Sequence, residues 1–171
     1  MISKKLESAI NKQINEELYS AYLYAAMLAY FESENLKGLA QWMRVQVQEE
    51  MFHATKFFNY ISTRGGRNEL EAIAKPQKEW KSPLDAFEAA YKHEQHITAC
   101  INGLVTLARK EEDYATETFL QWYVTEQVEE EMNTSEISGK IKLMGKSTEA
   151  LYMLDKELGA RTYTPPAQTQ A

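Results

Sequence analysis

Apolar side chains recur at every third or fourth position in four stretches of the chain, within residues 10–31, 39–60, 87–108 and 120–141. This spacing places the apolar side chains of each stretch on one face of an α-helix. Only seven glycines and four prolines interrupt a chain that is rich in helix-favouring residues. The pattern predicts an all-α protein in which four long helices bury their apolar faces against one another.

Residues that cap or stop helices set the expected boundaries. The first helix is expected over about 3–33 and the second over about 35–64, with Asn35 as the candidate N-cap. The Gly65-Gly66 pair supplies the left-handed backbone that commonly ends a helix.

Residues 65–82 show no helical periodicity, and the connection is long for a loop in a bundle. We expect it to cross over the length of the bundle and leave the second and third helices parallel. Ser82 and Pro83 are typical of a helix start, and this third helix should reach about 110. A short turn at 112–113 then leads into a fourth helix that ends near 144.

A short fifth helix is expected between Ser147, a candidate cap, and Gly159. Residues 1–160 are interpreted as one domain, which is long enough to bury a substantial core. Residues 161–171 contain two prolines and otherwise mostly polar side chains, and are predicted to form a flexible C-terminal tail.

Each apolar row is interrupted near its middle by polar side chains that are costly to bury. They are Glu17 in the first row, Glu50 and His53 in the second, Glu94 in the third, and Gln127 and Glu130 in the fourth. No Lys or Arg lies on these rows to neutralise the carboxylates. Charges inside proteins are normally paired or bound to a metal, so the rows predict a bound cation.

These polar residues follow the same spacing in the first and second halves of the chain. A Glu is followed 33 residues later by an i,i+3 pair: Glu17 precedes Glu50 and His53, and Glu94 precedes Gln127 and Glu130. Four-helix bundles build carboxylate-bridged di-iron centres from this arrangement, because an i,i+3 pair faces one side of a helix. We predict that Glu17 and His53 bind a first iron, Glu94 and Glu130 a second, and that Glu50 bridges them. Such donors suit Fe(II), and open positions would admit dioxygen.

Two side chains are expected beside these ligands. An amide is a poor ligand, so Gln127 either ligates weakly or hydrogen-bonds a water near the second iron. Tyr24 lies one heptad after Glu17 on the same row. It could hydrogen-bond a ligand or donate an electron, and the alternative is a core tyrosine with a satisfied hydroxyl.

Three further glutamates, Glu49, Glu126 and Glu129, adjoin the predicted ligands. Glu126 and Glu129 form an i,i+3 pair, and Glu49 precedes the bridge. They could bind an additional iron, or they could form an acidic, solvated face. Spacing alone does not separate the two interpretations.

The third helix carries three other side chains that can bind metals. His93 and His96 flank Glu94 but lie off its row, and are expected at the surface or in an interface. Cys100 is the only cysteine, which excludes an internal disulfide and suits a reducing cytoplasm. We expect it to be a buried, unreactive thiol.

Charge and hydropathy exclude two classes of partner. The net charge is −6, with no basic stripe to meet phosphates, so nucleic acid is not an expected partner. No apolar run approaches the roughly 18–20 residues of a membrane span, and the N-terminus lacks an apolar signal region. A cytoplasmic location is expected.

The chain closely resembles the bacterial non-haem ferritins. The resemblance is carried by the ligand set in its order, by the segment from Gln48 to Ala54 that reads QEEMFHA, and by Tyr19, Tyr22 and Tyr24. It implies a ferritin-like bundle in a shell of 24 identical subunits, which oxidises Fe(II) with O2 or H2O2 and stores a ferric oxyhydroxide mineral. It also implies that Glu17, Glu50, His53, Glu94, Gln127 and Glu130 match the ferroxidase positions, and that Glu49, Glu126 and Glu129 match a third iron site.

Two related groups are less similar. Bacterioferritins bind haem through a methionine, and Met51 occupies that position, but they carry Glu-x-x-His on the fourth helix where this chain has Gln127-x-x-Glu130. No haem is therefore expected. Rubrerythrins add a Cys-rich iron module, which one cysteine cannot build. The remaining alternative is a di-iron oxidoreductase or peroxidase of the rubrerythrin or bacterioferritin type that stores no iron.

Overall fold

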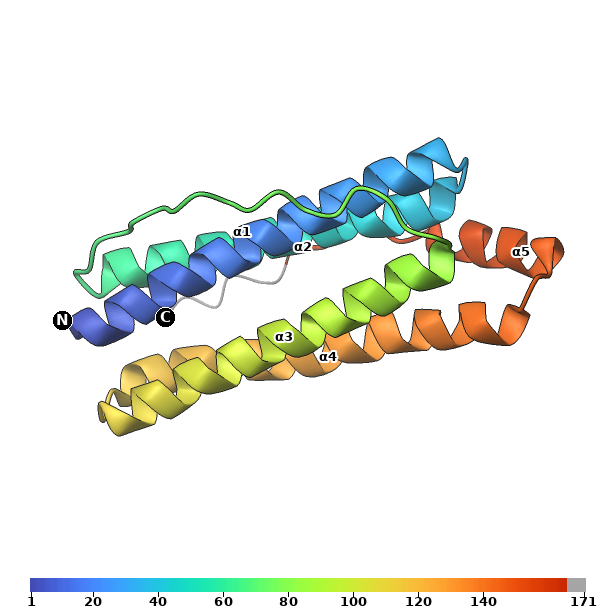
Figure 1. Ribbon diagram of the computed structural model, residues 1–171. Helices are drawn as coiled ribbons and strands as arrows, with labels where there is room; N and C mark the ends of the chain where they lie inside the picture. The colour runs from blue at the N-terminus through green and yellow to red at the C-terminus, as the bar shows by residue number, and fades with distance from the viewer. Residues whose placement is uncertain (166–171) are drawn as a thin grey trace.

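The computed structural model describes residues 1–165. Within this part of the chain all regular structure is helical: α1 (Lys4–Ser33), α2 (Lys37–Thr63), α3 (Pro83–Lys110), α4 (Tyr114–Met144) and α5 (Thr148–Leu158). Helices α1 and α2 form one antiparallel hairpin, α3 and α4 form a second, and α5 lies at one end against α2 (Figure 1). Of these helices, none is both long and apolar enough to cross a membrane. The predicted all-α bundle with a short fifth helix is confirmed.

The connection between α2 and α3 runs back along the first hairpin, so α2 and α3 start at the same end of the bundle (Figure 1). Near its start, Asn11 accepts a hydrogen bond from the Glu69 backbone N–H (2.8 Å) and donates one to the Arg67 carbonyl (2.9 Å). Near its end, the buried Trp80 ring packs against Tyr30, with ring centroids 5.4 Å apart. The predicted crossover is confirmed, and these contacts attach it to α1.

Side-chain caps explain most of the helix starts. Ser3, Ser82 and Ser147 each accept a hydrogen bond from the backbone N–H three residues later. Gly65 adopts a positive φ of 71°, and the Gly66 N–H reaches the Ile61 carbonyl at 2.9 Å, so this pair ends α2 as predicted.

Asn35 does not have its predicted role as the N-cap of α2. Its φ is 61°, and its N–H donates to the Glu32 carbonyl while the Leu36 N–H donates to Phe31. Asn tolerates the left-handed conformation that this helix stop requires, so Asn35 ends α1 and α2 begins only at Lys37.

The core consists of two apolar clusters with a polar layer between them. The cluster nearer α5 includes Phe31, Met43 and Phe87, and the other includes Ile10, Phe57 and Ile101. The buried polar side chains that come from the middle of the helices include Glu17, Gln46, Glu50, His53, Glu94, Gln127 and Glu130. Apolar packing at both ends therefore holds the helices that position this layer.

Candidate metal centre

All four long helices contribute to the polar layer. Glu17 comes from α1, Glu50 and His53 from α2, Glu94 from α3, and Gln127 and Glu130 from α4. Each of these six side chains is at most 4% exposed. The structure therefore brings together the six positions that the repeated spacing singled out.

The α1/α2 half of the layer is a compact group. Glu17, Glu50 and His53 each offer one donor atom within 4.8 Å of the others. The Nδ1 atom of His53 lies 3.3 Å from Glu50 Oε2 and 3.9 Å from Glu17 Oε2. Glu17 Oε1 accepts a hydrogen bond from Gln13 (2.9 Å), but Glu17 Oε2 is buried and has no hydrogen-bond partner among the described residues. A buried carboxylate oxygen without a donor is the position that a cation would fill.

The α3/α4 half is held by hydrogen bonds within the protein. The Tyr24 hydroxyl and the Gln127 amide (3.2 Å) both donate to the carboxylate of Glu94. The Gln46 amide donates to Glu130 Oε2 at 2.9 Å. The acids of this half therefore already have partners, unlike Glu17 Oε2.

Burial and mutual repulsion favour the protonated acids. Burial raises the pKa of Glu17, and raises that of Glu50 well above its usual value. Burial and neighbouring acids raise the pKa of Glu94 to about 7 and of Glu130 to about 8. Burial opposes the charged imidazole, but Glu50 and the other acids raise the pKa of His53 well above its usual value. Divalent cations would displace these protons, and carboxylate and imidazole donors fit Fe(II).

Tyr24 is fully buried, and its hydroxyl contacts the centre by donating a hydrogen bond to the Glu94 carboxylate. Gln127 presents its amide nitrogen to the same carboxylate, and to the Glu94 carbonyl at 3.3 Å. In this arrangement both residues orient Glu94. The roles of Tyr24 in electron transfer and of Gln127 in metal ligation stay predictions.

The three glutamates of the predicted additional site differ in their surroundings. Glu126 Oε1 lies 3.7 Å from His53 Nε2, and these two form a second metal-capable group with Glu130. Glu49 is ion-paired with Arg161, whose guanidinium lies 2.7 Å from Glu49 Oε2. Glu129 is exposed. Within residues 1–165 the three do not form one metal-capable group.

Arg161 connects the predicted tail to the centre. It also donates to Gln46 Oε1 at 2.6 Å, and Gln46 in turn donates to Glu130. Residue 161 is thus held against α2, whereas 166–171 of the predicted tail lie outside the described residues. Sequence reasoning did not find Arg161, because it lies beyond the helical periodicity.

Two other side chains lie near the centre, Gln46 and His93. Gln46 lies on the second apolar row, one turn before Glu50, and its amide is buried. A polar residue at this position of the row is the signal that could have predicted a hydrogen-bond donor to the ligands. His93, expected at the surface or in an interface, is half-buried and lies 2.7 Å from Ser20 Oγ. Burial lowers the pKa of His93 to about 4, which keeps the imidazole neutral.

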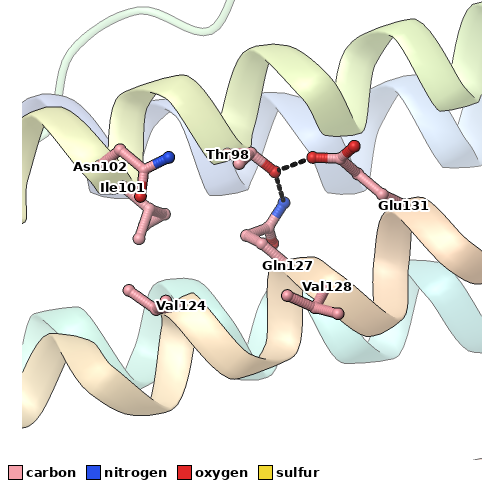
Figure 2. A pocket seen from close by; sticks show the side chains of 7 residues that line it. All are labelled: Thr98, Ile101, Asn102, Val124, Gln127, Val128 and Glu131. Atoms are coloured by element: carbon pink, nitrogen blue, oxygen red, sulfur yellow. Dashed lines mark hydrogen bonds between the residues drawn. The ribbon is translucent and has the colours of Figure 1, made fainter.

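A cavity of ≈ 280 Å³ lies between α3 and α4, and Gln127 forms part of its wall. Figure 2 shows Gln127 and Glu131 directed toward Thr98, which donates to Glu131 at 2.6 Å and accepts from Gln127 at 3.5 Å. Because Gln127 also contacts Glu94, the cavity ends beside the predicted ligands of the second iron.

Comparison with known proteins identifies the family. A family model described as a ferritin-like domain matches residues 7–144. The chain belongs to the ferritin family. The bacterial non-heme ferritin of Bacteroides fragilis is 43% identical over 161 residues, which cover 94% of this chain and 100% of that protein. That of Staphylococcus aureus is 40% identical over 163 residues, which cover 95% and 98%. The resemblance predicted from the sequence is confirmed.

Solved ferritin structures match this ferritin over nearly its whole length. An open-pore ferritin from the hyperthermophilic archaeon Archaeoglobus fulgidus is 53% identical, with a TM-score of 0.94 over 95% of this chain and 100% of that chain. A form of the Archaeoglobus fulgidus ferritin engineered to be closed has a TM-score of 0.95 at 53% identity, over 96% of this chain and 100% of that chain.

Proposed function

We propose that this ferritin oxidises Fe(II) at the buried centre and stores the ferric product inside a shell of 24 subunits. The observation that carries the proposal is the group formed by Glu17, Glu50 and His53, in which one oxygen of Glu17 has no partner within the described part of the chain. It lies in the middle of a ferritin bundle, where a cation relieves the cost of burying the acids.

The substrates are two Fe(II) ions and one O2 molecule. Each Fe(II) gives up one electron, and O2 takes the two electrons together with two protons to form H2O2. Glu50 is suited to the bridging position, because the charges of both Glu94, on α3, and Glu17, on α1, raise its pKa. The protein's part is to hold both ions at reacting distance and to exclude bulk water from the layer.

The cavity beside Gln127 supports a route by which small reactants reach the centre from the α3/α4 side. Thr98 and Glu131 give its wall polar oxygen atoms, which an entering Fe(II) ion prefers to an apolar wall. Replacing Val128, an exposed residue of this wall, by Trp should slow oxidation at limiting Fe(II) without changing the number of ions bound.

Iron loading tests the function as a whole. Fe(II) is added aerobically to the assembled protein well beyond two equivalents per chain, and the retained iron and particle mass are measured by size exclusion with light scattering. Storage predicts that far more than two irons per chain remain with one large soluble particle. Saturation near two irons would instead support a di-iron oxidoreductase or peroxidase that stores nothing.

A further inference from the structure

A third group of metal-capable side chains lies outside the buried centre, where α1 and α3 meet. Glu16, His96 and Cys100 each present one donor atom within 4.8 Å of the others. His96 Nε2 lies 3.0 Å from Glu16 Oε2 and 3.6 Å from Cys100 Sγ. His96 is exposed, and the other two side chains are half-buried.

Helix geometry explains why these residues meet. His96 and Cys100 are four residues apart on α3, so both side chains lie on one face of that helix. Glu16 comes from α1, which packs against α3, and it directly precedes the buried Glu17. Two rigid helices therefore fix three donors of different chemistry at one place.

We propose that Glu16, His96 and Cys100 bind one divalent transition-metal ion, with Zn²⁺ as the best match. Tetrahedral Zn²⁺ holds sulfur at about 2.3 Å and nitrogen at about 2.0–2.1 Å, which places these two ligands about 3.6 Å apart. The separation in the structure is 3.6 Å. Nitrogen and oxygen ligands should be about 3.3 Å apart, so His96 and Glu16 need to separate by only a few tenths of an ångström.

The donor set distinguishes this site from the buried centre. A thiolate and an imidazole favour a borderline-soft ion such as Zn²⁺ or Co²⁺, whereas the carboxylate-rich centre suits Fe(II). Burial and the charges of Glu16 and Glu17 raise the pKa of the Cys100 thiol, so the thiol keeps its proton until a metal displaces it. Three protein ligands leave the fourth position of a tetrahedral ion to water.

Cobalt reports on this site selectively, because Cys100 is the only cysteine in the chain. Co²⁺ is titrated into the assembled, metal-free protein under reducing conditions, and the thiolate-to-cobalt charge-transfer band is recorded in the near ultraviolet. The band should saturate at one ion per chain and disappear when Zn²⁺ is added. Cys100→Ser should abolish it, whereas His96→Ala and Glu16→Gln should each weaken Co²⁺ binding on the order of tenfold.

Two controls separate this site from the centre. Glu50→Ala should leave the band unchanged, and Gln95→Ala, an exposed neighbour on α3, should leave both the band and its midpoint unchanged. Cys100→Ser should still oxidise Fe(II), so a failure of this proposal is distinguishable from a failure of the proposed function. The proposal is overturned if wild-type protein gives no band, or if His96→Ala and Glu16→Gln bind Co²⁺ as tightly as wild type, since a thiol alone would then be sufficient.

Discussion

The two halves of the buried centre have the same spacing in the sequence but different surroundings in the structure. In the α1/α2 half, Glu17, Glu50 and His53 converge, and no side chain or backbone group of residues 1–165 donates to Glu17 Oε2. In the α3/α4 half, Glu94 accepts hydrogen bonds from Tyr24 and Gln127, and Glu130 accepts one from Gln46. In the first half one buried carboxylate oxygen lacks a donor, whereas in the second half each acid accepts at least one hydrogen bond from the protein.

This difference predicts unequal affinities for the two ions. A hydrogen bond to a charged group contributes about 1.5–3 kcal/mol, so an ion that replaces such bonds binds less favourably than one that fills an unpartnered position. The first Fe(II) should therefore enter the α1/α2 half. The second should bind more weakly, and only as the acids of the α3/α4 half turn from their protein donors toward the metal.

The largest effect is expected from removing Glu50, the proposed bridge between the two ions. Glu50→Ala should lower the rate of the first phase of iron oxidation on the order of a thousandfold, equivalent to about 4 kcal/mol, because neither ion is then held at reacting distance from the other. Stopped-flow absorbance after adding two Fe(II) per chain measures this rate. Glu88→Ala, an exposed change on α3, is the matched control. A folded Glu50→Ala protein that oxidises at the wild-type rate would exclude the bridging assignment.

The pH dependence of the metal-free protein probes the α3/α4 half. The folded-state pKa values of Glu94 and Glu130, about 7 and about 8, lie above the usual 4.5. Their stabilising contribution is fully present below 4.5 and is lost as pH rises through 7 and 8, because the unfolded chain releases these protons first. The free energy of unfolding should fall by up to about 1.4 kcal/mol per pH unit for each proton.

Thermal melts of the metal-free protein between pH 5 and 9 measure this loss. The raised pKa of His53 acts in the same direction, since its stabilisation is also lost as pH rises. Glu130→Gln removes one titrating acid and should flatten the profile. A melting temperature that rises steadily over this range, in both proteins, would contradict the assignment of protonated acids to the centre.

The part of the centre on the helix rows could be predicted from the sequence, because an acid in an apolar row stands out against its neighbours. Glu17 and Glu94 are such cases, and the rows also placed the apolar core on either side of them. The inequality of the halves could not be predicted. It depends on which neighbours donate to each acid, and Tyr24 and Gln46 reach theirs from other helices. Arg161 lies after the last helix and on none of the apolar rows, so no periodicity in the sequence indicates its contact with the centre.

A smaller effect should follow from satisfying the α1/α2 half without metal. Glu17→Gln replaces a buried ionisable acid by an amide that is neutral at every pH, and we expect it to raise the free energy of unfolding of the metal-free protein by about 1 kcal/mol while weakening the first Fe(II) site. Calorimetry of unfolding and anaerobic Fe(II) titration measure the two effects. Gln13→Ala, which removes only the donor to Glu17, should not stabilise the protein. Loss of stability in Glu17→Gln would indicate that this carboxylate has a structural hydrogen-bonding role.

The smallest effect on stability is expected at the edge of the centre, where Arg161 neutralises Glu49. Breaking a half-exposed ion pair of this kind costs about 0.2–1 kcal/mol. Arg161→Ala should nevertheless release Glu49 from its ion pair. Glu49 and Glu126 already repel each other electrostatically, so together they should favour the binding of a third ion beside Glu130.

Anaerobic calorimetric titration measures this change as Fe(II) bound per chain, which should rise from two toward three in Arg161→Ala. In an aerobic assay, electrons from a third iron would reduce O2 beyond peroxide and raise the Fe:O2 ratio above two. Adding Glu49→Ala and Glu126→Ala to Arg161→Ala should return both numbers to two while the first phase of oxidation stays fast. If Arg161→Ala still binds two ions per chain, there is no third iron site, and Glu49 and Glu126 are part of a solvated acidic face. The two halves of the buried centre then account for all of the bound iron.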